Sequence, residues 1–314
     1  MTAPVHIGTR GSELALVQAD ATEAALAERH PGIALERRII KTTGDRRTDV
    51  SLAEVAKAEG IFDKGIFIKE LEQALDDGSI DIAVHSLKDM PTVLEERFRL
   101  AAVLERAPVR DVLLTRGGVG FDELPQGARV GTSSVRRAAQ LKFLRPDIEI
   151  VEIRGNVPTR VKKVLGENAL DAVLLAAAGL LRLGLLNANL SRIHIEAQTL
   201  HALVLDPVKF LPAAGQGAIA IECRADDDVS IRAVRSLNHA ETEARVAAER
   251  EFLKILGAGC QTPVGAHTWV KDHNLHMAVR VFNEADLSLA PVERQACRPL
   301  HEAKQLAADL AAQL

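Results

Sequence analysis

A weak internal repeat in the first two thirds of the chain constrains its fold more than any other sequence feature. Residues 5–12 (VHIGTRGS) resemble residues 129–134 (RVGTSS), because each is a short apolar stretch followed by Gly-Thr and a Ser that can cap a helix. Helical patterns then run from Glu13 to Arg29 and from Val135 to Leu144, and a proline follows each. Alternating β-branched strands come next, at Ile33–Lys41 and Ile148–Arg154. The repeat predicts two α/β domains built on mostly parallel sheets.

The rest of the chain indicates two connections and a third domain. Glu105–Gly127 is rich in Gly, Pro and Arg, which is typical of a crossover linker. Leu211–Cys223 is Gly-rich and then strand-like, which favours a return to the first sheet. A third unit is expected to hold a charged helix, two strands and a terminal helix, at Ala240–Leu256, Thr268–Val270, Leu275–Phe282 and His301–Leu314. The predicted domains are 1–104 with 213–235, 110–205, and 240–314.

Composition argues against several classes of protein. The formal net charge of −4 gives no global basic field for nucleic acid, and an aromatic content of 3% offers few rings for base stacking. The longest apolar run, Ala172–Leu181, is far shorter than the ~20 residues of a membrane-spanning helix. Three cysteines without a CxxC pair argue against disulfides and against a zinc site. The first residues show no secretory signal, so we expect a cytoplasmic protein with reduced thiols.

Polar and basic side chains gather where the predicted strands end. In open α/β sheets, ligands bind at the carboxyl ends of the strands. The window Arg129–Lys163 holds nine Lys/Arg against three Asp/Glu. A solvated basic face is one interpretation; a cleft for a small polyanion with several carboxylates is the other, and the gathering at four strand ends favours it. The residues concerned are Thr9, Arg10, Ser12, Ser86, Lys88, Asp89, Thr132, Ser133, Ser134, Arg136, Arg137, Arg154, Gly155, Asn156 and Arg160.

Three further residues and one segment have two possible roles each. His85 ends a strand and is either a buried structural histidine, which we favour, or a base. A carboxylate at Asp89, beside Lys88, is expected to stay ionised and to stabilise a cation on the substrate or exchange a proton with it. Cys260 lies between glycines on a tight loop, and its thiol is either reactive or an ordinary one. The charged segment 45–64 fits a lid or a solvated loop.

The assembled motifs resemble those of the porphobilinogen deaminase (hydroxymethylbilane synthase) family. The strings that carry the resemblance run in order from about residue 5 to 282: TRGSELALVQA, KTTGD, KGIFIKELE, DIAVHSLKDMP, GTSSVRRAAQL, RGNVPTR, AAGQGAIAIECR, LNHAETEARVAAERE and GAGCQTPVG. The resemblance implies an enzyme of tetrapyrrole biosynthesis that joins four porphobilinogen molecules head to tail, releases ammonia at each step, and yields 1-hydroxymethylbilane. It also implies a covalent dipyrromethane cofactor, a cytoplasmic monomer, and no nucleic-acid or membrane partner.

The resemblance further implies a fold and roles for individual residues. The fold has two binding-protein-like (type II periplasmic-binding-protein-like) α/β domains around a cleft, and a smaller C-terminal α+β domain with an antiparallel sheet. Cys260 would hold the cofactor through a thioether, and Asp89 with Lys88 would assist deamination and coupling. Lys64 and Phe67 match the family's lid. The residues expected to bind the cofactor and the carboxylates are Arg10, Ser12, Lys88, Asp89, Thr132, Ser133, Ser134, Arg136, Arg137, Arg154, Gly155 and Arg160.

Three stretches depart from the family pattern. Ala53–Asp63 is longer than the usual Gly-rich segment before the lid lysine, Pro158 interrupts the RGNVPTR motif, and Asn187–Lys209 is extended. A different class of protein also fits the architecture, namely a non-enzymatic bilobal protein that binds anions. Such a protein has no need of Cys260, and a colour test for pyrroles on the purified protein separates the two hypotheses.

Overall fold

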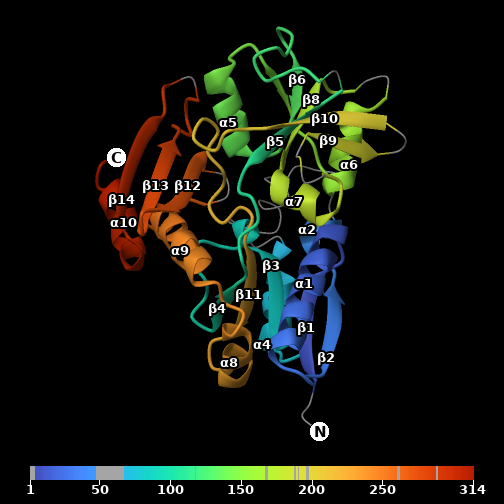
Figure 1. Cartoon of the computed structure of the whole chain (residues 1–314), viewed down its shortest axis with the longest axis vertical. Helices are drawn as coiled ribbons and strands as arrows, with labels where there is room; N and C mark the ends of the chain where they lie inside the picture. The colour runs from blue at the N-terminus through green and yellow to red at the C-terminus, as the bar shows by residue number, and fades with distance from the viewer. Residues whose placement is uncertain are drawn as a thin grey trace.

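The computed structural model describes residues 4–46, 67–116, 118–166, 169–186, 189, 191–195, 198–259, 262–287 and 289–314. In this part of the chain, three sheets define the architecture (Figure 1). Two are α/β sheets that lie at the bottom and the top of the view, and the third is a small antiparallel sheet beside them. The predicted fold class, with two α/β domains and an antiparallel C-terminal unit, is confirmed. No described helix is long and apolar enough to span a bilayer.

The first sheet has the strand order β2-β1-β3-β11-β4. Its strands are β1 (Val5–Arg10), β2 (Leu35–Ile40), β3 (Ile82–Ser86), β4 (Phe98–Val103) and β11 (Ile219–Arg224). Its helices are α1 (Glu13–Arg29), α2 (Thr43–Arg46), α4 (Lys69–Asp76), the 3₁₀ turn η2 (Leu87–Asp89) and α8 (Asp228–Arg235). As predicted, Ser12 caps α1 by accepting a hydrogen bond from the Ala15 backbone N–H. The first sheet therefore contains both an N-terminal segment and a segment returning from later in the chain.

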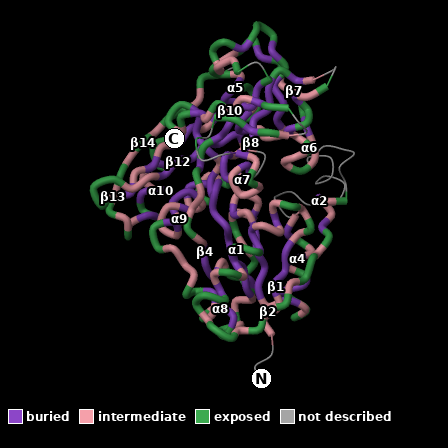
Figure 2. Tube along the Cα trace, turned by 45° about the vertical axis from the view of Figure 1, so that its right-hand side comes forward, coloured by how far each residue is buried: buried purple, intermediate pink, exposed green. Residues whose placement is uncertain are grey.

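The second sheet has the strand order β7-β6-β8-β5-β10-β9. Its strands are β5 (Asp111–Thr115), β6 (Arg129–Gly131), β7 (Glu149–Val151), β8 (Ala172–Ala176), β9 (Arg192–Ile195) and β10 (Gln198–Val204). Its helices are α5 (Val135–Leu144), α6 (Val157–Val161), the 3₁₀ turn η3 (Lys162–Val164) and α7 (Ala177–Arg182). The β9–β10 hairpin falls within the extended stretch 187–209 and adds an antiparallel edge to this sheet. The inner strands β3, β5, β8 and β11 are largely buried, whereas the edge strands β2, β7 and β9 are mostly half-buried or exposed (Figure 2).

Two expectations about these sheets are wrong. Neither sheet is mostly parallel: β11 pairs antiparallel with β3 and β4, and β5 pairs antiparallel with β8 and β10. The reason is that β5 and β11 follow crossovers and enter their sheets from the side that faces the other unit. The stretch 105–127 is not only a linker, because it contains β5, whose five residues are all buried. The sequence pattern missed β5 because this short apolar strand is flanked by Gly, Pro and Arg residues that are typical of a linker.

The third unit packs an antiparallel sheet on two helices. The sheet order is β12-β13-β14, with β12 at Val264–Lys271, β13 at Asn274–Val281 and β14 at Val292–Pro299. The helices are α9 (Ala240–Ile255), the 3₁₀ turn η4 (Leu300–Glu302) and α10 (Ala303–Ala311). Buried side chains of Phe252, Met277 and Leu306 form the centre of its core. Sequence analysis missed β14 because its outward side chains are exposed and largely polar, and it predicted β12 too short.

Two crossover segments, 104–110 and 205–218, connect the α/β units and touch each other. A Cβ at Gly217 would lie 2.4 Å from the backbone oxygen of Ala107, and Gly217 has a φ of +88°, so only glycine permits this approach. The third unit holds both crossovers through a buried ion pair. Glu249 of α9 binds the Arg106 guanidinium at 2.8 Å and 2.9 Å and accepts the Gly215 backbone N–H at 2.7 Å.

Candidate functional site

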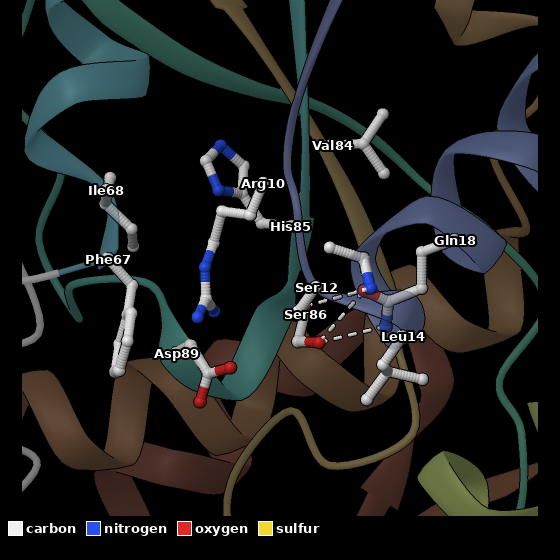
Figure 3. Close-up of a pocket in the computed structure, with 11 residues that line it drawn as sticks. Arg10, Ser12, Leu14, Gln18, Phe67, Ile68, Val84, His85, Ser86 and Asp89 are labelled. Atoms are coloured by element: carbon white, nitrogen blue, oxygen red, sulfur yellow. Dashed lines mark hydrogen bonds between the residues drawn. The ribbon is translucent and has the colours of Figure 1, made fainter. Parts of the chain in front are cut away.

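One pocket lies where β1 and β3 end in the first unit (Figure 3). Arg10, Ser12, Phe67 and Asp89 line it, so four residues that the sequence singled out come together. The Arg10 guanidinium lies 4.0 Å from the centroid of the Phe67 ring and donates to the Asp45 carboxylate at 2.5 Å and 3.1 Å. Burial alone would raise the pKa of Asp45, but the bonds from Arg10 outweigh it and lower that pKa. The orientation of Arg10 is therefore fixed from two sides.

The far wall of this pocket is an amide–hydroxyl pair and a buried histidine. Gln18 and Ser86 are hydrogen-bonded to each other at 2.9 Å, as Figure 3 shows with dashed lines. The neighbouring residue of β3, His85, lies beside Arg10 (Figure 3) and is 5% exposed, and its Nε2 lies 2.9 Å from Oε2 of the fully buried Glu222. A carboxylate directly behind the ring favours the structural interpretation of His85 over a role as base.

A second pocket lies between the two α/β units and shares Gln18 and Ser86 with the first. Four cationic side chains line it: Lys88 from the first unit, and Arg137, Arg160 and Arg182 from the second. Burial lowers the pKa of Lys88 to about 8 and those of Arg160 and Arg182 to about 10, and neighbouring cations add to the shifts of Lys88 and Arg160. Cations that have lost water without gaining an equal number of carboxylates favour an anionic ligand.

Asp111 of β5 forms ion pairs with two arginines of α5, one of which belongs to this cationic group. Its carboxylate pairs with Arg136 at 2.9 Å and with Arg137 at 2.7 Å. Burial would raise the pKa of Asp111, but the two guanidinium groups outweigh it and hold that pKa well below its usual range. Arg137 reaches from Asp111 into the second pocket, whereas Arg136 lines neither pocket and donates to the Leu211 carbonyl at 2.5 Å.

The remaining predicted residues of the second unit shape the backbone around these cations. Ser134 caps α5 by accepting the Arg137 backbone N–H, and the Thr132 hydroxyl accepts the Ser134 backbone N–H. Gly155 has a φ of +106°, and its carbonyl accepts a hydrogen bond from Arg160 Nε at 2.7 Å. The other predicted members, Ser133 and Arg154, are half-buried beside them. Pro158 lies in the first turn of α6, where a missing N–H costs nothing, so Arg160 keeps its place.

Cys260, Lys64 and the stretch 53–63 lie outside the described residues. Hydrogen bonds hold the described residues on either side of the loop that contains Cys260: the Ala258 carbonyl accepts the Thr92 hydroxyl at 3.2 Å, and the Gly259 N–H donates to the Thr262 hydroxyl at 3.2 Å. Thr92 follows the turn that carries Asp89, so Ala258 lies against the segment after that turn. Among the described residues, no group of three or more His, Cys, Asp or Glu side chains is arranged to hold a metal ion.

Sequence analysis missed four residues of this region. Arg182 is the last residue of α7, the helix after β8, so the rule that ligands bind at strand ends does not mark it. Gln18 lies one and a half turns into α1 and carries no motif. Asp111 falls in the stretch predicted as a crossover linker, and Gln216 in the Gly-rich stretch predicted to return to the first sheet; no local pattern marks either as a partner of the arginines.

A pocket between two α/β units that is lined by four desolvated cations is typical of proteins that bind a small polyanion. Comparisons with known proteins specify the family. The model described as "Porphobilinogen deaminase, dipyromethane cofactor binding domain" matches residues 5–232, and "Porphobilinogen deaminase, C-terminal domain" matches residues 243–314. The chain belongs to the porphobilinogen deaminase family. The predicted dipyrromethane cofactor is thereby confirmed, whereas its attachment to Cys260 stays a prediction.

Curated relatives agree with the family models over most of the chain. The porphobilinogen deaminase of Trichlorobacter lovleyi is 48% identical over 271 residues, which cover 86% of this chain and 80% of the relative. That of Syntrophotalea carbinolica is 42% identical over 307 residues, which cover 98% and 91%. The chain is therefore a transferase enzyme, and the non-enzymatic alternative is not favoured.

Solved structures of binding proteins resemble this chain only weakly, both in sequence and in fold. The methionine-binding protein MetQ is 12% identical with a TM-score of 0.45, over 78% of this chain and 94% of that one. The effector-binding domain of a BenM variant is 14% identical with a TM-score of 0.40, over 82% and 98%. Likenesses of this strength have no bearing on function.

Proposed function

We propose that this chain is a hydroxymethylbilane synthase, which joins four porphobilinogen molecules head to tail and releases ammonia at each step to give 1-hydroxymethylbilane. The observation that carries the proposal is the set of four desolvated cations around the second pocket, Lys88, Arg137, Arg160 and Arg182. Each porphobilinogen brings an acetate and a propionate, and each guanidinium can bind a carboxylate through two parallel hydrogen bonds. A substrate whose charge grows by two carboxylates at each addition explains why so many cations gather there.

The described residues fit a dipyrromethane cofactor in charge. Its two rings carry four carboxylates, and the acidic groups that act on the pocket cations are Asp89, on Lys88 and Arg160, and Asp111, which is already paired with Arg136 and Arg137. We expect Lys88, Arg137 and Arg160 to hold these carboxylates, and Cys260 to supply the thioether sulfur. Ser12, Ser133, Ser134, Arg136, Arg154 and Gly155 would contribute hydrogen bonds or shape the wall. When bound, the cofactor supplies the free pyrrole carbon to which the first substrate is joined.

Asp89 is the residue best placed for the chemistry. Loss of ammonia breaks the C–N bond of the substrate side chain and leaves an electron-poor methylene pyrrole. A C–C bond to this methylene would then replace the lost C–N bond, and the proton displaced from the attacking pyrrole carbon would leave with the ammonia or with solvent. A carboxylate fixed beside the pyrrole stabilises the positive charge before the C–C bond forms. Asp89 lines the first pocket beside Arg10 and Phe67, and Lys88 adjoins it in η2.

Further assignments follow from this proposal. Arg10 and Ser12 would bind carboxylates of the incoming substrate, and Phe67 with Lys64 would close over it. The domain boundaries proposed are 1–104 with 213–235, 110–205 and 240–314; the return of β11 to the first sheet supports the first of these. We also propose that the enzyme acts as a monomer in the cytoplasm.

Intact-mass analysis of the purified protein tests the proposal most simply. The expected mass exceeds that of the bare chain by two linked pyrrole units. Cys260→Ala should carry no adduct and release no ammonia from porphobilinogen, whereas Cys297→Ala, a change at an exposed free thiol, should keep both. A bare-chain mass together with binding of porphobilinogen but no ammonia would instead favour the non-enzymatic anion-binding protein.

A further inference from the structure

Gln216, in the second crossover, joins the charged groups of both α/β units although it lines neither pocket. The residue is fully buried. Its side-chain N–H₂ donates to the Val109 carbonyl at 2.7 Å and to Asp111 Oδ1 at 2.9 Å. Its side-chain oxygen accepts a hydrogen bond from Lys88 Nζ at 3.4 Å. One amide therefore contacts a cation of the first unit and the carboxylate that holds the cations of the second.

The charges around Lys88 make this neutral contact significant. Arg136 and Arg137 from α5 face Lys88, as do Asp111 from β5 and Asp89 from its own turn. Arg160 and Arg182 line the same pocket. Burial and the two α5 arginines weaken the protonated form of Lys88, while Asp89 and Asp111 strengthen it. An uncharged acceptor at Gln216 orients the amine without neutralising it, so the charge of Lys88 stays available to a ligand.

The Asp111 side of the contact is equally specific. Asp111 Oδ1 accepts from both Arg137 and Gln216, at 2.7 Å and 2.9 Å. The amide N–H₂ thus donates to the carboxylate without adding a charge. Gln216 belongs to the second crossover, and its backbone carbonyl accepts a hydrogen bond from Arg106 of the first crossover at 2.9 Å, so the two crossovers hold the amide in place.

We propose that Gln216 is a positioning residue for the reaction: it sets Lys88 of the first unit against the Asp111–Arg137 pair of the second, so that cations from both units face one anionic ligand. The inference rests on the proposed function, because the ligand concerned is the carboxylated pyrrole chain. Gln216 acts through Lys88 and Asp111 and does not itself touch the ligand.

The first arm of the test measures the charge state of Lys88 and requires no activity. The probe is reductive methylation of Lys88, followed against pH by peptide mass spectrometry, and the midpoint of each variant is compared with that of the native protein. Gln216→Glu keeps the shape but places a carboxylate on the amine, so the midpoint should rise by about one unit or more. Gln216→Met removes the acceptor and should lower it.

Gln140→Met is the matched control for this arm. Gln140 is also fully buried and also bonds backbone groups, accepting from Leu211 N–H at 2.7 Å, but it has no contact with Lys88. Its replacement should lower stability and leave the Lys88 midpoint unchanged. Equal midpoints in the native protein, Gln216→Glu and Gln216→Met would overturn the proposed contact.

The second arm is a double-mutant cycle on ligand binding, with Gln216→Met and Lys88→Met alone and combined. The apparent dissociation constant of porphobilinogen is read from its stabilisation of the folded protein. Gln216→Met alone should weaken binding about tenfold, and it should add little once Lys88 is replaced, because the two residues act as one unit. Additive losses would assign Gln216 a merely structural role. If porphobilinogen binds neither the native protein nor any variant, the proposed function is wrong. The Lys88 midpoints still show in that case whether Gln216 contacts Lys88.

Discussion

Two buried carboxylates, Glu249 in α9 and Asp111 in β5, are both held by arginines. The charges around Glu249 are matched, whereas those around Asp111 are not. Glu249 meets one arginine: Arg106 binds both of its oxygens, and the Gly215 N–H and the Thr268 hydroxyl complete its hydrogen bonds. Asp111 meets two arginines, with Lys88 close by. In the first cluster each charge has its counterpart, and neither pocket includes it. In the second, positive charge exceeds negative and borders the pocket.

A buried carboxylate paired with arginine thus serves a different purpose in each cluster. A balanced, fully hydrogen-bonded pair fixes the third unit to the two crossovers and leaves no affinity for a ligand. A cluster with surplus cations keeps some of its hydrogen-bonding capacity for an anion that comes from solution, at a cost in stability while it is empty. We therefore expect changes in the Glu249 cluster to act on folding and changes near Asp111 to act on binding and turnover.

The largest effect is expected at Glu249. Glu249→Ala leaves Arg106 buried without a counter-charge, which should lower the free energy of unfolding by about 3–5 kcal/mol. Denaturant unfolding followed by circular dichroism measures the change. Glu251→Ala, on the same helix and 3.7 Å from Lys254, serves as the control and should shift stability by less than about 1 kcal/mol. A loss no greater than in the control would remove the structural role assigned to this cluster.

The next effect concerns chemistry rather than folding. Asp89→Asn keeps the shape of the pocket but removes the charge, so single-turnover ammonia release should fall by two or more orders of magnitude, equivalent to ~2.7–4 kcal/mol. Binding of porphobilinogen should persist, because the arginines are untouched. Asp89→Glu retains the charge about one methylene further out and should keep partial activity. Normal ammonia release from loaded Asp89→Asn would make Asp89 a binding residue only.

A smaller effect is expected from pH. The pKa of Lys88 is lowered to about 8 by burial and by Arg137, so the amine is protonated below that pH and loses its charge as the pH rises through it. Because a bound carboxylate favours the protonated amine, affinity for porphobilinogen should fall above pH 8, by at most about tenfold per pH unit for one proton. Lys88→Arg stays charged and should remove this decline. A decline that persists in Lys88→Arg belongs to another group.

The repeat in the sequence was enough to predict the paired α/β units and much of the first pocket. Helices α1 and α5 have the predicted bounds because Ser12 and Ser134 cap their starts and prolines follow their ends. Arg10 and Asp89 were found because strand ends converge at one edge of a sheet. Phe67 was assigned only through the family resemblance.

The charge balance of the two clusters could not be predicted in the same way. Asp111 lies 26 residues from Arg137 and 105 from Gln216, so their contacts arise from the crossovers and not from any local pattern. A sequence window can count cations, but it cannot show which of them share a carboxylate. For that reason the basic window suggested equal roles for Arg136 and Arg137, whereas only Arg137 reaches the pocket.

We expect the surplus cations near Asp111, and not the balanced cluster at Glu249, to bind the pyrrole chain. The direct test is an intact-mass time course after adding porphobilinogen to the native protein, Arg137→Leu and Thr268→Val, each shown to be folded. Thr268→Val removes one hydrogen bond to the charged Glu249, should cost about 1.5–3 kcal/mol of stability, and should leave the stepwise gain of pyrrole units unchanged. Arg137→Leu should fail to gain them. Normal additions in Arg137→Leu, with additions lost in Thr268→Val, would contradict the account.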